Sequence, residues 1–246
     1  MVKNGALPAR DYYDRIAGDF NAELETRRAY VSAVDDLLVA VATRLGSPSL
    51  LDVGCGNGAR LEEILARIPM RAHAIDVSPR MVALARARGI DAREADIASS
   101  QMDAALSSLR VDLVSALWNV LGHIPSREER LTALRNMRSL LRPGGRIFFD
   151  VNNRYNAADY GWTPAIRNWV RDRIRPKGAG DFLVSRPVSG APTGTVTHLF
   201  CLREVIELCR ASGLAPTEIH FVGYARGTPG RGQWAGQLCV TAELAG

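Results

Sequence analysis

The feature that most constrains the fold is a regular alternation of short apolar runs with amphipathic segments between residues 48 and 152. The runs have the length and composition of buried strands, and the segments between them carry apolar residues at helical spacing. Strands that alternate with helices form parallel sheets, which bind ligands beyond the carboxyl ends of their strands. We therefore expect the ligand site at that edge. The predicted strands cover 49–55, 72–78, 91–97, 111–118 and 145–151, and the predicted helices cover 59–68, 81–89 and 126–141.

The segments that flank this core have different patterns. A helix is expected over 25–45, because apolar residues recur there at steps of three and four before Gly46 and Pro48. Residues 153–200 are rich in Gly, Pro, Arg and Trp without a clear period, so we interpret them as an insertion or lid over the site. A helix at 202–213 and two strands, 217–225 and 237–244, complete the chain, and the turn-rich RGTPGRG between the strands favours an antiparallel hairpin.

Together these elements predict one α/β domain. Its sheet is expected to be seven-stranded, doubly wound and mostly parallel, with an antiparallel C-terminal hairpin, N-terminal helices and a lid insertion. The expected parts are a helical cap (1–47), the ligand-binding core (48–152), the lid or acceptor-binding insertion (153–200), and the C-terminal helix and hairpin (201–246).

Composition bears on whether this domain spans a membrane, is secreted or binds a metal. Hydrophobic residues make up 47% and charged residues 23% of the chain, and no apolar run is long enough to span a bilayer. The first ten residues lack the apolar stretch of a secretory signal, which favours a cytoplasmic protein. The four cysteines lack the spacing of a zinc site, so we predict buried thiols and no metal.

A glycine-rich turn and three carboxylates mark the expected site. The turn, residues 54–58 (GCGNG), follows a strand and opens a helix, where glycines let the backbone pass close to a ligand. A dinucleotide-binding turn has similar spacing. Asp52, Asp76 and Asp96 lie at or near the ends of three expected strands, and three acids on one rim would repel a pyrophosphate. They suit a ligand with an ammonium and a sulfonium better, and Asp76 has the position of an acid that accepts ribose hydroxyl bonds.

Four segments together resemble the class I S-adenosylmethionine-dependent methyltransferases, small-molecule branch. They are LLDVGCGNGARL, AIDVSPRMVALARARG, EADIAS and LRPGGRIFFDV, and the resemblance runs from about Tyr12 to Asn152. It implies S-adenosylmethionine as cofactor and S-adenosylhomocysteine as product.

The resemblance also implies roles for individual residues. Asp52 and the backbone of residues 54–58 would hold the methionyl part, Asp76 the ribose, Val77 and Met81 the adenine ring, and Asp96 and Ile97 its amine edge. The segment YYDRIAGDF resembles one that closes over the cofactor in this family. The alternative is that it is a helix that only packs on the core. The residues expected at the cofactor are Tyr13, Asp52, Gly54, Cys55, Gly56, Asn57, Gly58, Asp76, Val77, Met81, Asp96, Ile97, Leu117 and Trp118.

The residues after the fourth strand are the catalytic candidates. The family places residues beside the transferred methyl where Leu117, Trp118 and Asn119 stand, and in-line geometry supplies much of the rate of such a transfer. His123 is a candidate general base for an acceptor hydroxyl or amine, or else a structural hydrogen-bonding residue. We predict Asn119 and His123 as catalytic candidates. The NPPY-type motif of DNA-base methyltransferases is replaced by WNVL, so DNA is not an expected substrate.

The expected lid holds the candidates for acceptor binding. Residues 154–177 contain six basic and two acidic residues with two tryptophans among them. Such a segment could cover an acceptor pocket, bind an anionic acceptor or contact RNA, and a solvated lid is the alternative. The residues considered for acceptor contact are Tyr12, Phe20, Asn153, Tyr155, Trp162, Trp169, His198 and Arg226.

Three functions compete at this level. The first is an N-, O- or C-methyltransferase acting on a small molecule of anionic or aromatic character, as a monomer or homodimer. The second is a tRNA-modifying methyltransferase, because YDRIAGDFN followed by DVGCGNG also resembles a wobble-uridine branch. The third is a non-catalytic regulator that keeps the fold and the cofactor. We favour the first, since much of the chain outside the core is the expected lid.

Overall fold

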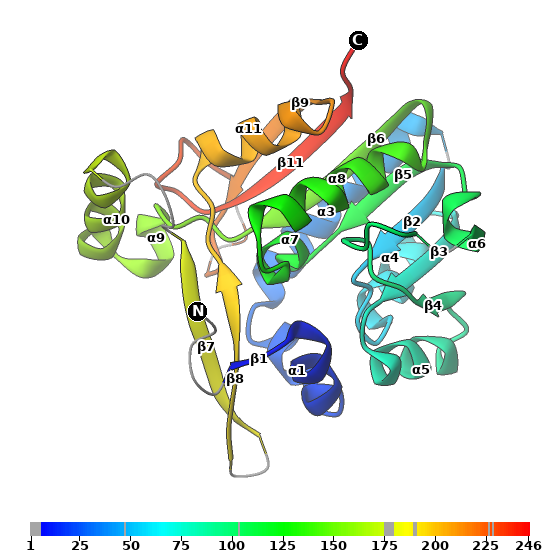
Figure 1. Cartoon of the computed structure of the whole chain (residues 1–246), viewed down its shortest axis with the longest axis horizontal. Coiled ribbons are helices and arrows are strands. Elements are labelled where there is room, and N and C mark those ends of the chain that lie inside the picture. Colours follow the sequence, from blue (N-terminus) through cyan, green and yellow to red (C-terminus); the bar gives the residue numbers. More distant parts are fainter. Residues whose placement is uncertain are drawn as a thin grey trace.

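A computed structural model describes residues 6–46, 48–102, 104–174, 180–188, 191–225, 227 and 229–246. An eight-stranded sheet with the order β10-β9-β11-β6-β5-β2-β3-β4 crosses the molecule (Figure 1). Strands β6, β5, β2, β3 and β4 run parallel, and β11 pairs antiparallel with β6 and β9. The strands are β2 (Ser49–Val53), β3 (Arg71–Asp76), β4 (Ala92–Glu94), β5 (Val111–Ala116), β6 (Leu141–Val151), β9 (Leu214–Val222), β10 (Pro229–Gly230) and β11 (Gln237–Leu244).

This arrangement confirms the predicted doubly wound, mostly parallel sheet with its antiparallel hairpin. Within this sheet, the only difference in strand number among the described residues is the two-residue β10, which extends the expected seven strands at the β9 edge. The helices are α1 (Ala9–Ile16), α2 (Phe20–Glu25), α3 (Arg28–Leu45), α4 (Ala59–Arg67), α5 (Pro79–Ala87), α6 (Ala104–Ser107), α7 (Val120–His123), α8 (Arg127–Ser139), α9 (Ala157–Tyr160), α10 (Trp162–Ile174) and α11 (Leu202–Ala211).

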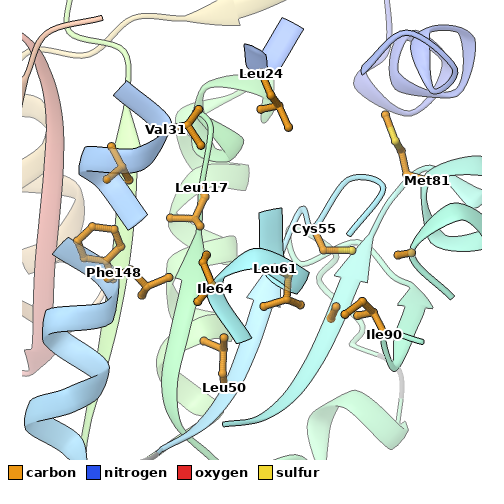
Figure 2. Packing of buried hydrophobic residues seen from close by; sticks show 14 of the residues in the cluster. Leu24, Val31, Leu50, Cys55, Leu61, Ile64, Met81, Ile90, Leu117 and Phe148 are labelled. Atoms are coloured by element: carbon orange, nitrogen blue, oxygen red, sulfur yellow. The ribbon is translucent and has the colours of Figure 1, made fainter. Parts of the chain in front are cut away.

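Two hydrophobic cores hold helices to the two faces of the sheet. Helices α3, α4 and α5 pack on one face, and α8 and α11 pack on the other. Figure 2 shows Leu61 and Ile64 of α4 beside Leu50 of β2, and all three are almost fully buried. Burial of each such side chain stabilises the fold by about 1.5–3 kcal/mol. The cores leave the carboxyl ends of the parallel strands open for a site.

Local signals fix where the core helices begin. Ser126 caps α8 in a capping box with Glu129, since its hydroxyl accepts from the Glu129 N–H and that carboxylate accepts from the Ser126 N–H. Ser78 caps α5 by accepting from the Met81 N–H. Both serines stand where the sequence predicted helix starts.

Three segments differ from the pattern expected from sequence. The helix expected over 25–45 is interrupted at Arg27, whose backbone is not helical, so α2 and α3 are separate. The expected turn 142–145 belongs to β6, which shifts register against β5 there. Residues 153–200 contain α9, α10 and a hairpin of β7 (Asp181–Val188) and β8 (Ala191–His198).

The hairpin belongs to a second, smaller sheet. Strand β1 (Ala6–Leu7) pairs parallel with β8, so the N-terminal segment and the insertion lie side by side (Figure 1). Helix α10 lies at the end of the molecule opposite α5 and β4. Within the described residues, no helix is long and apolar enough to cross a membrane.

Candidate active site

A cavity of about 590 Å³ opens at the carboxyl ends of β2, β3, β4 and β5. Its volume lies within the range of small-molecule and cofactor sites. Helix α1 and the segment that follows it supply the wall across from the strand ends. The sequence-predicted residues that line this cavity are Tyr13, Phe20, Gly54, Gly56, Asp76, Val77, Asp96, Ile97, Leu117, Trp118 and His123.

The glycine turn forms a surface that admits no side chain. Gly54 has φ +71°, and a Cβ there would lie 2.5 Å from Val120 Cγ2. Gly56 has φ +55°, and a Cβ there would lie 2.9 Å from Phe20 Cε1. Both conformations and both close approaches require glycine. The turn is thus a cradle in which backbone, rather than side chain, faces the cavity.

Asp76 is the acid most firmly held at this edge. Its carboxylate accepts from the N–H groups of Gly56 at 2.8 Å and Ser78 at 2.9 Å. Burial raises its pKa, and these backbone donors offset part of that effect. Glu94, Asp96 and Glu129 also line the cavity, which gives the rim an acidic character.

Sequence reasoning missed a basic group on this rim. Arg10 of α1 lines the cavity and pairs with Glu94 at 2.6 Å, which ties the helix to the end of β4. Asp14, also on α1, accepts from the Ser78 hydroxyl. No local pattern in the sequence around Arg10 indicated its contact with Glu94.

Five residues expected at the cofactor do not line the cavity. The Asp52 carboxylate accepts from the Ser115 hydroxyl at 2.6 Å, and burial raises its pKa to about 6. Asn57 donates to Asn21, and Met81 is fully buried in the core (Figure 2). The five are Asp52, Cys55, Asn57, Gly58 and Met81.

A second cavity of about 100 Å³ adjoins the first. Tyr13, Trp118 and His123 line both cavities, so these three side chains form a shared wall. The other residues that line the smaller cavity are Tyr12, Arg27, Tyr30, Asn119, Asp150, Asn152, Val184, Thr195, Thr197 and Tyr224.

His123 is neutral at this wall. Its Nε2 lies 2.9 Å from the Tyr13 hydroxyl, and its buried Nδ1 has no hydrogen-bond partner within the described part of the chain. Burial lowers its pKa to about 4. The ring is therefore unprotonated at neutral pH, which is the form of a general base, and its low pKa makes it a weak one.

Asn119, the other catalytic candidate, is engaged by the protein itself. Its amide nitrogen donates to Thr197 Oγ1 at 2.8 Å, and its amide oxygen accepts from the Asn152 N–H at 2.9 Å. It thus joins the loop after β5 to β8 and to the end of β6. Its side chain lines the smaller cavity with both polar ends already satisfied.

Most of the residues considered for acceptor contact lie away from both cavities. Tyr12 and Phe20 line a cavity each. Asn153 is buried against the backbone of Gln233 and Gly236, and Tyr155 donates to Asp172. Arg226 lies outside the described residues. Those placed elsewhere are Asn153, Tyr155, Trp162, Trp169 and His198.

The aromatic and basic groups of the insertion contact one another. Trp162 and Trp169 gather around Trp234, and His198 lies between Asp181 and Glu204. Arg154 is 5% exposed and pairs with Asp172 and Glu204. Part of the positive charge expected on a lid is therefore neutralised internally.

Comparison with known proteins gives the family. The sequence profile described as "Methyltransferase domain" matches residues 51–147. A ubiquinone biosynthesis O-methyltransferase of Xanthomonas campestris is 35% identical over 129 residues, 48% of this chain and 49% of that protein. A protein of the same description from Azotobacter vinelandii is 30% identical over 180 residues, 72% of this chain and 68% of that protein. The chain spans about half the length of the Xanthomonas relative.

Solved structures agree on the fold. A crystal structure of an S-adenosylmethionine-dependent methyltransferase from Clostridium acetobutylicum is 14% identical, with a TM-score of 0.64 over 93% of this chain and 99% of that one. An open, mostly parallel sheet with an acid-rimmed cavity at its carboxyl edge defines a nucleoside-binding α/β protein. The chain belongs to the class I S-adenosylmethionine-dependent methyltransferases.

Proposed function

We propose that this protein transfers a methyl group from S-adenosylmethionine to a nitrogen, oxygen or carbon atom of a small molecule. The larger cavity would hold the cofactor and the smaller one the acceptor. The observation that carries the proposal is the shared wall of Tyr13, Trp118 and His123, because a direct transfer requires the two ligands to meet at one place. The names of the Xanthomonas and Azotobacter relatives favour oxygen as the acceptor atom.

The residues at the larger cavity fit the cofactor. The cradle at Gly54 and Gly56 excludes side chains, as a ligand in contact with backbone requires. Asp76 would accept from the ribose hydroxyls, and Asp96 would accept from the adenine amine. When bound, S-adenosylmethionine supplies a methyl group already attached to a good leaving group, so the protein need mainly position the acceptor.

His123 is the basic group on the shared wall, and its chemistry favours oxygen as the atom that receives the methyl group. A ring nitrogen with a pKa of about 4 is a weak base. It can take a proton from an oxygen that becomes acidic as the new bond forms. It would not deprotonate an alkylammonium, whose pKa lies near 10. We propose His123 as the proton acceptor for an oxygen nucleophile and Tyr13 as the residue that orients its ring.

The test is transfer of label to a defined fraction of a cell extract. The purified protein is incubated with the extract and S-adenosylmethionine labelled on the methyl group, and the small-molecule and RNA fractions are analysed separately by mass spectrometry. Label in a small molecule, with S-adenosylhomocysteine released in equal amount, is the expected result. Label in RNA alone would overturn the proposal, and so would failure of the protein to bind S-adenosylhomocysteine in calorimetry.

A further inference from the structure

The smaller cavity has polar walls that are largely satisfied within the protein. Asp150, at its floor, accepts from the Tyr30 hydroxyl at 2.6 Å with one oxygen and from the Trp118 N–H at 2.7 Å with the other. Tyr224 donates to the Asn152 side chain at 2.6 Å. Groups already paired in this way have little to offer a ligand.

Arg27 is the exception. It is the only arginine or lysine among the described residues that line this cavity. Its Cζ lies 3.7 Å from the ring centroid of Tyr224 and 5.9 Å from that of Trp118. Across the described residues, no carboxylate lies within 4.0 Å of its guanidinium and no hydrogen bond satisfies it. Its neighbour Arg28 is exposed and pairs with Glu63 instead.

Stacking leaves the binding groups of Arg27 available. A guanidinium presents its N–H groups in its own plane, so a ring over its face does not use them. The half-buried position of Arg27 strengthens its attraction for an anion, because fewer waters screen the charge. The only acid that lines the same cavity, among the residues described, is Asp150. Burial raises its pKa, and the nearby positive charge of Arg60 offsets its negative charge, which reduces its repulsion of an anion.

Position and size define what would fit. Arg27 lines the same cavity as Trp118 and His123 of the shared wall, so a small molecule inside it can contact the guanidinium and the wall at once. The cavity of about 100 Å³ is smaller than the roughly 150 Å³ cavity that accommodates benzene in an engineered protein. An acceptor of a few heavy atoms, smaller than one aromatic ring, is therefore favoured.

Resting on the proposed function, we propose that the acceptor is a small oxyanion whose carboxylate or phosphate group is bound by Arg27. The opposite end of the molecule then presents its nucleophile beside His123. Guanidinium groups bind carboxylates and phosphates alike through paired N–H donors, so the proposal covers both kinds of oxyanion.

The experiment measures binding of simple anions to the protein saturated with S-adenosylhomocysteine. Acetate and inorganic phosphate are titrated in calorimetry, and acetamide, which has the shape of acetate without its charge, is the matched neutral probe. We expect acetate or phosphate to bind and acetamide to bind at least about tenfold more weakly. Which anion binds distinguishes a carboxylate acceptor from a phosphorylated one.

Variants locate the binding group. Arg27→Gln should weaken binding of the anion at least about tenfold, and Arg27→Lys should retain part of it. Arg28→Gln, which changes the exposed neighbour, should leave anion binding unchanged. The affinity for S-adenosylhomocysteine should be unaltered in all three variants, because neither arginine lines the larger cavity. That unaltered affinity also shows that each variant is folded.

Three outcomes would overturn the inference. They are equal binding of acetate and acetamide, unchanged anion binding by Arg27→Gln, and no binding of either anion to the wild-type complex at about 10 mM. Each of these leaves the proposed function standing as long as S-adenosylhomocysteine binds. If the wild-type protein does not bind S-adenosylhomocysteine, the proposed function fails and this inference fails with it.

Discussion

Replacing Asp76 with alanine should both destabilise the glycine turn and weaken cofactor binding, because this carboxylate has two roles. In the protein alone it accepts from the N–H groups of Gly56 and Ser78. With the cofactor bound, it would also accept from the ribose hydroxyls that the proposed function places there. Its loss should therefore lower both the free energy of unfolding and the affinity for the cofactor, and these two effects can be measured separately.

The structure allows both the loss of stability and the loss of cofactor affinity to be estimated. A hydrogen bond to a charged group contributes roughly 1.5–3 kcal/mol to stability. Since Asp76 and Gly56 line the cavity, where water can replace part of the loss, the variant should be less stable by about 2–3 kcal/mol. For a chain of this length that lowers the melting temperature by about 4–12 °C. Loss of one bond to a ribose hydroxyl weakens binding by about 10- to 150-fold.

Thermal unfolding with and without S-adenosylhomocysteine, together with calorimetry, separates the two effects. Asp36→Ala is the matched control, because Asp36 is an exposed aspartate that lines neither cavity. The control should retain the wild-type affinity and most of the stability. If Asp76→Ala melts at a lower temperature but binds S-adenosylhomocysteine as tightly as the wild type, the carboxylate is structural only and the proposed ribose contact is wrong.

Three further substitutions test other parts of the site. The pKa of Asp52 is raised to about 6, so the folded state holds this proton more tightly than the unfolded state and the wild type loses stability as pH rises from about 4 to 6. Asp52→Asn should lack that loss and be up to about 3 kcal/mol more stable at pH 7.5, as urea unfolding at pH 4.5 and 7.5 would show. His123→Ala should slow methyl transfer by about 10²- to 10⁴-fold in a labelled-cofactor assay without changing affinity for S-adenosylhomocysteine, and unchanged turnover would make the residue structural. Gly56→Ala should cost about 1–2 kcal/mol for its left-handed backbone and also displace Phe20 and weaken binding of S-adenosylhomocysteine, whereas Gly89→Ala, with φ +81° and open space around it, should show the backbone cost alone. Equal affinities of these two glycine variants for S-adenosylhomocysteine in calorimetry would contradict the cradle.

The core could be predicted because its signals are local. Apolar periodicity marked the strands and helices of residues 48–152, and side-chain caps at Ser78 and Ser126 marked helix starts. The β7–β8 hairpin was missed because its buried side chains are not apolar. On the described part of β8 the buried side chains are those of Thr193, Thr195, Thr197 and His198, which hydropathy does not distinguish from a polar loop.

The cofactor side of the site was also readable from sequence, but the acceptor side was not. Strand ends and a glycine turn are local features, and they pointed to Asp76 and Gly56. Arg27 and Tyr224 meet across nearly the whole chain, and no local pattern reports such a contact. Asp150 did carry a signal, since it stands near the end of a predicted strand as Asp76 does. The same rule applied to the fifth strand would have found it.

The insertion then acquires a role in addition to the acceptor binding that its composition suggested. Trp118 and Asn119 have φ of +68° and +60°, a left-handed conformation that costs about 1–2 kcal/mol for a residue with a side chain. Such strain persists only where the surroundings enforce it. Here Asp150 holds the Trp118 N–H, and Thr197 of β8 holds the Asn119 side chain. The hairpin thus stabilises the backbone that presents Trp118 to both cavities, and its residues Val184, Thr195 and Thr197 line the smaller cavity, so it would contribute to methyl transfer both through the wall and through contact with the acceptor.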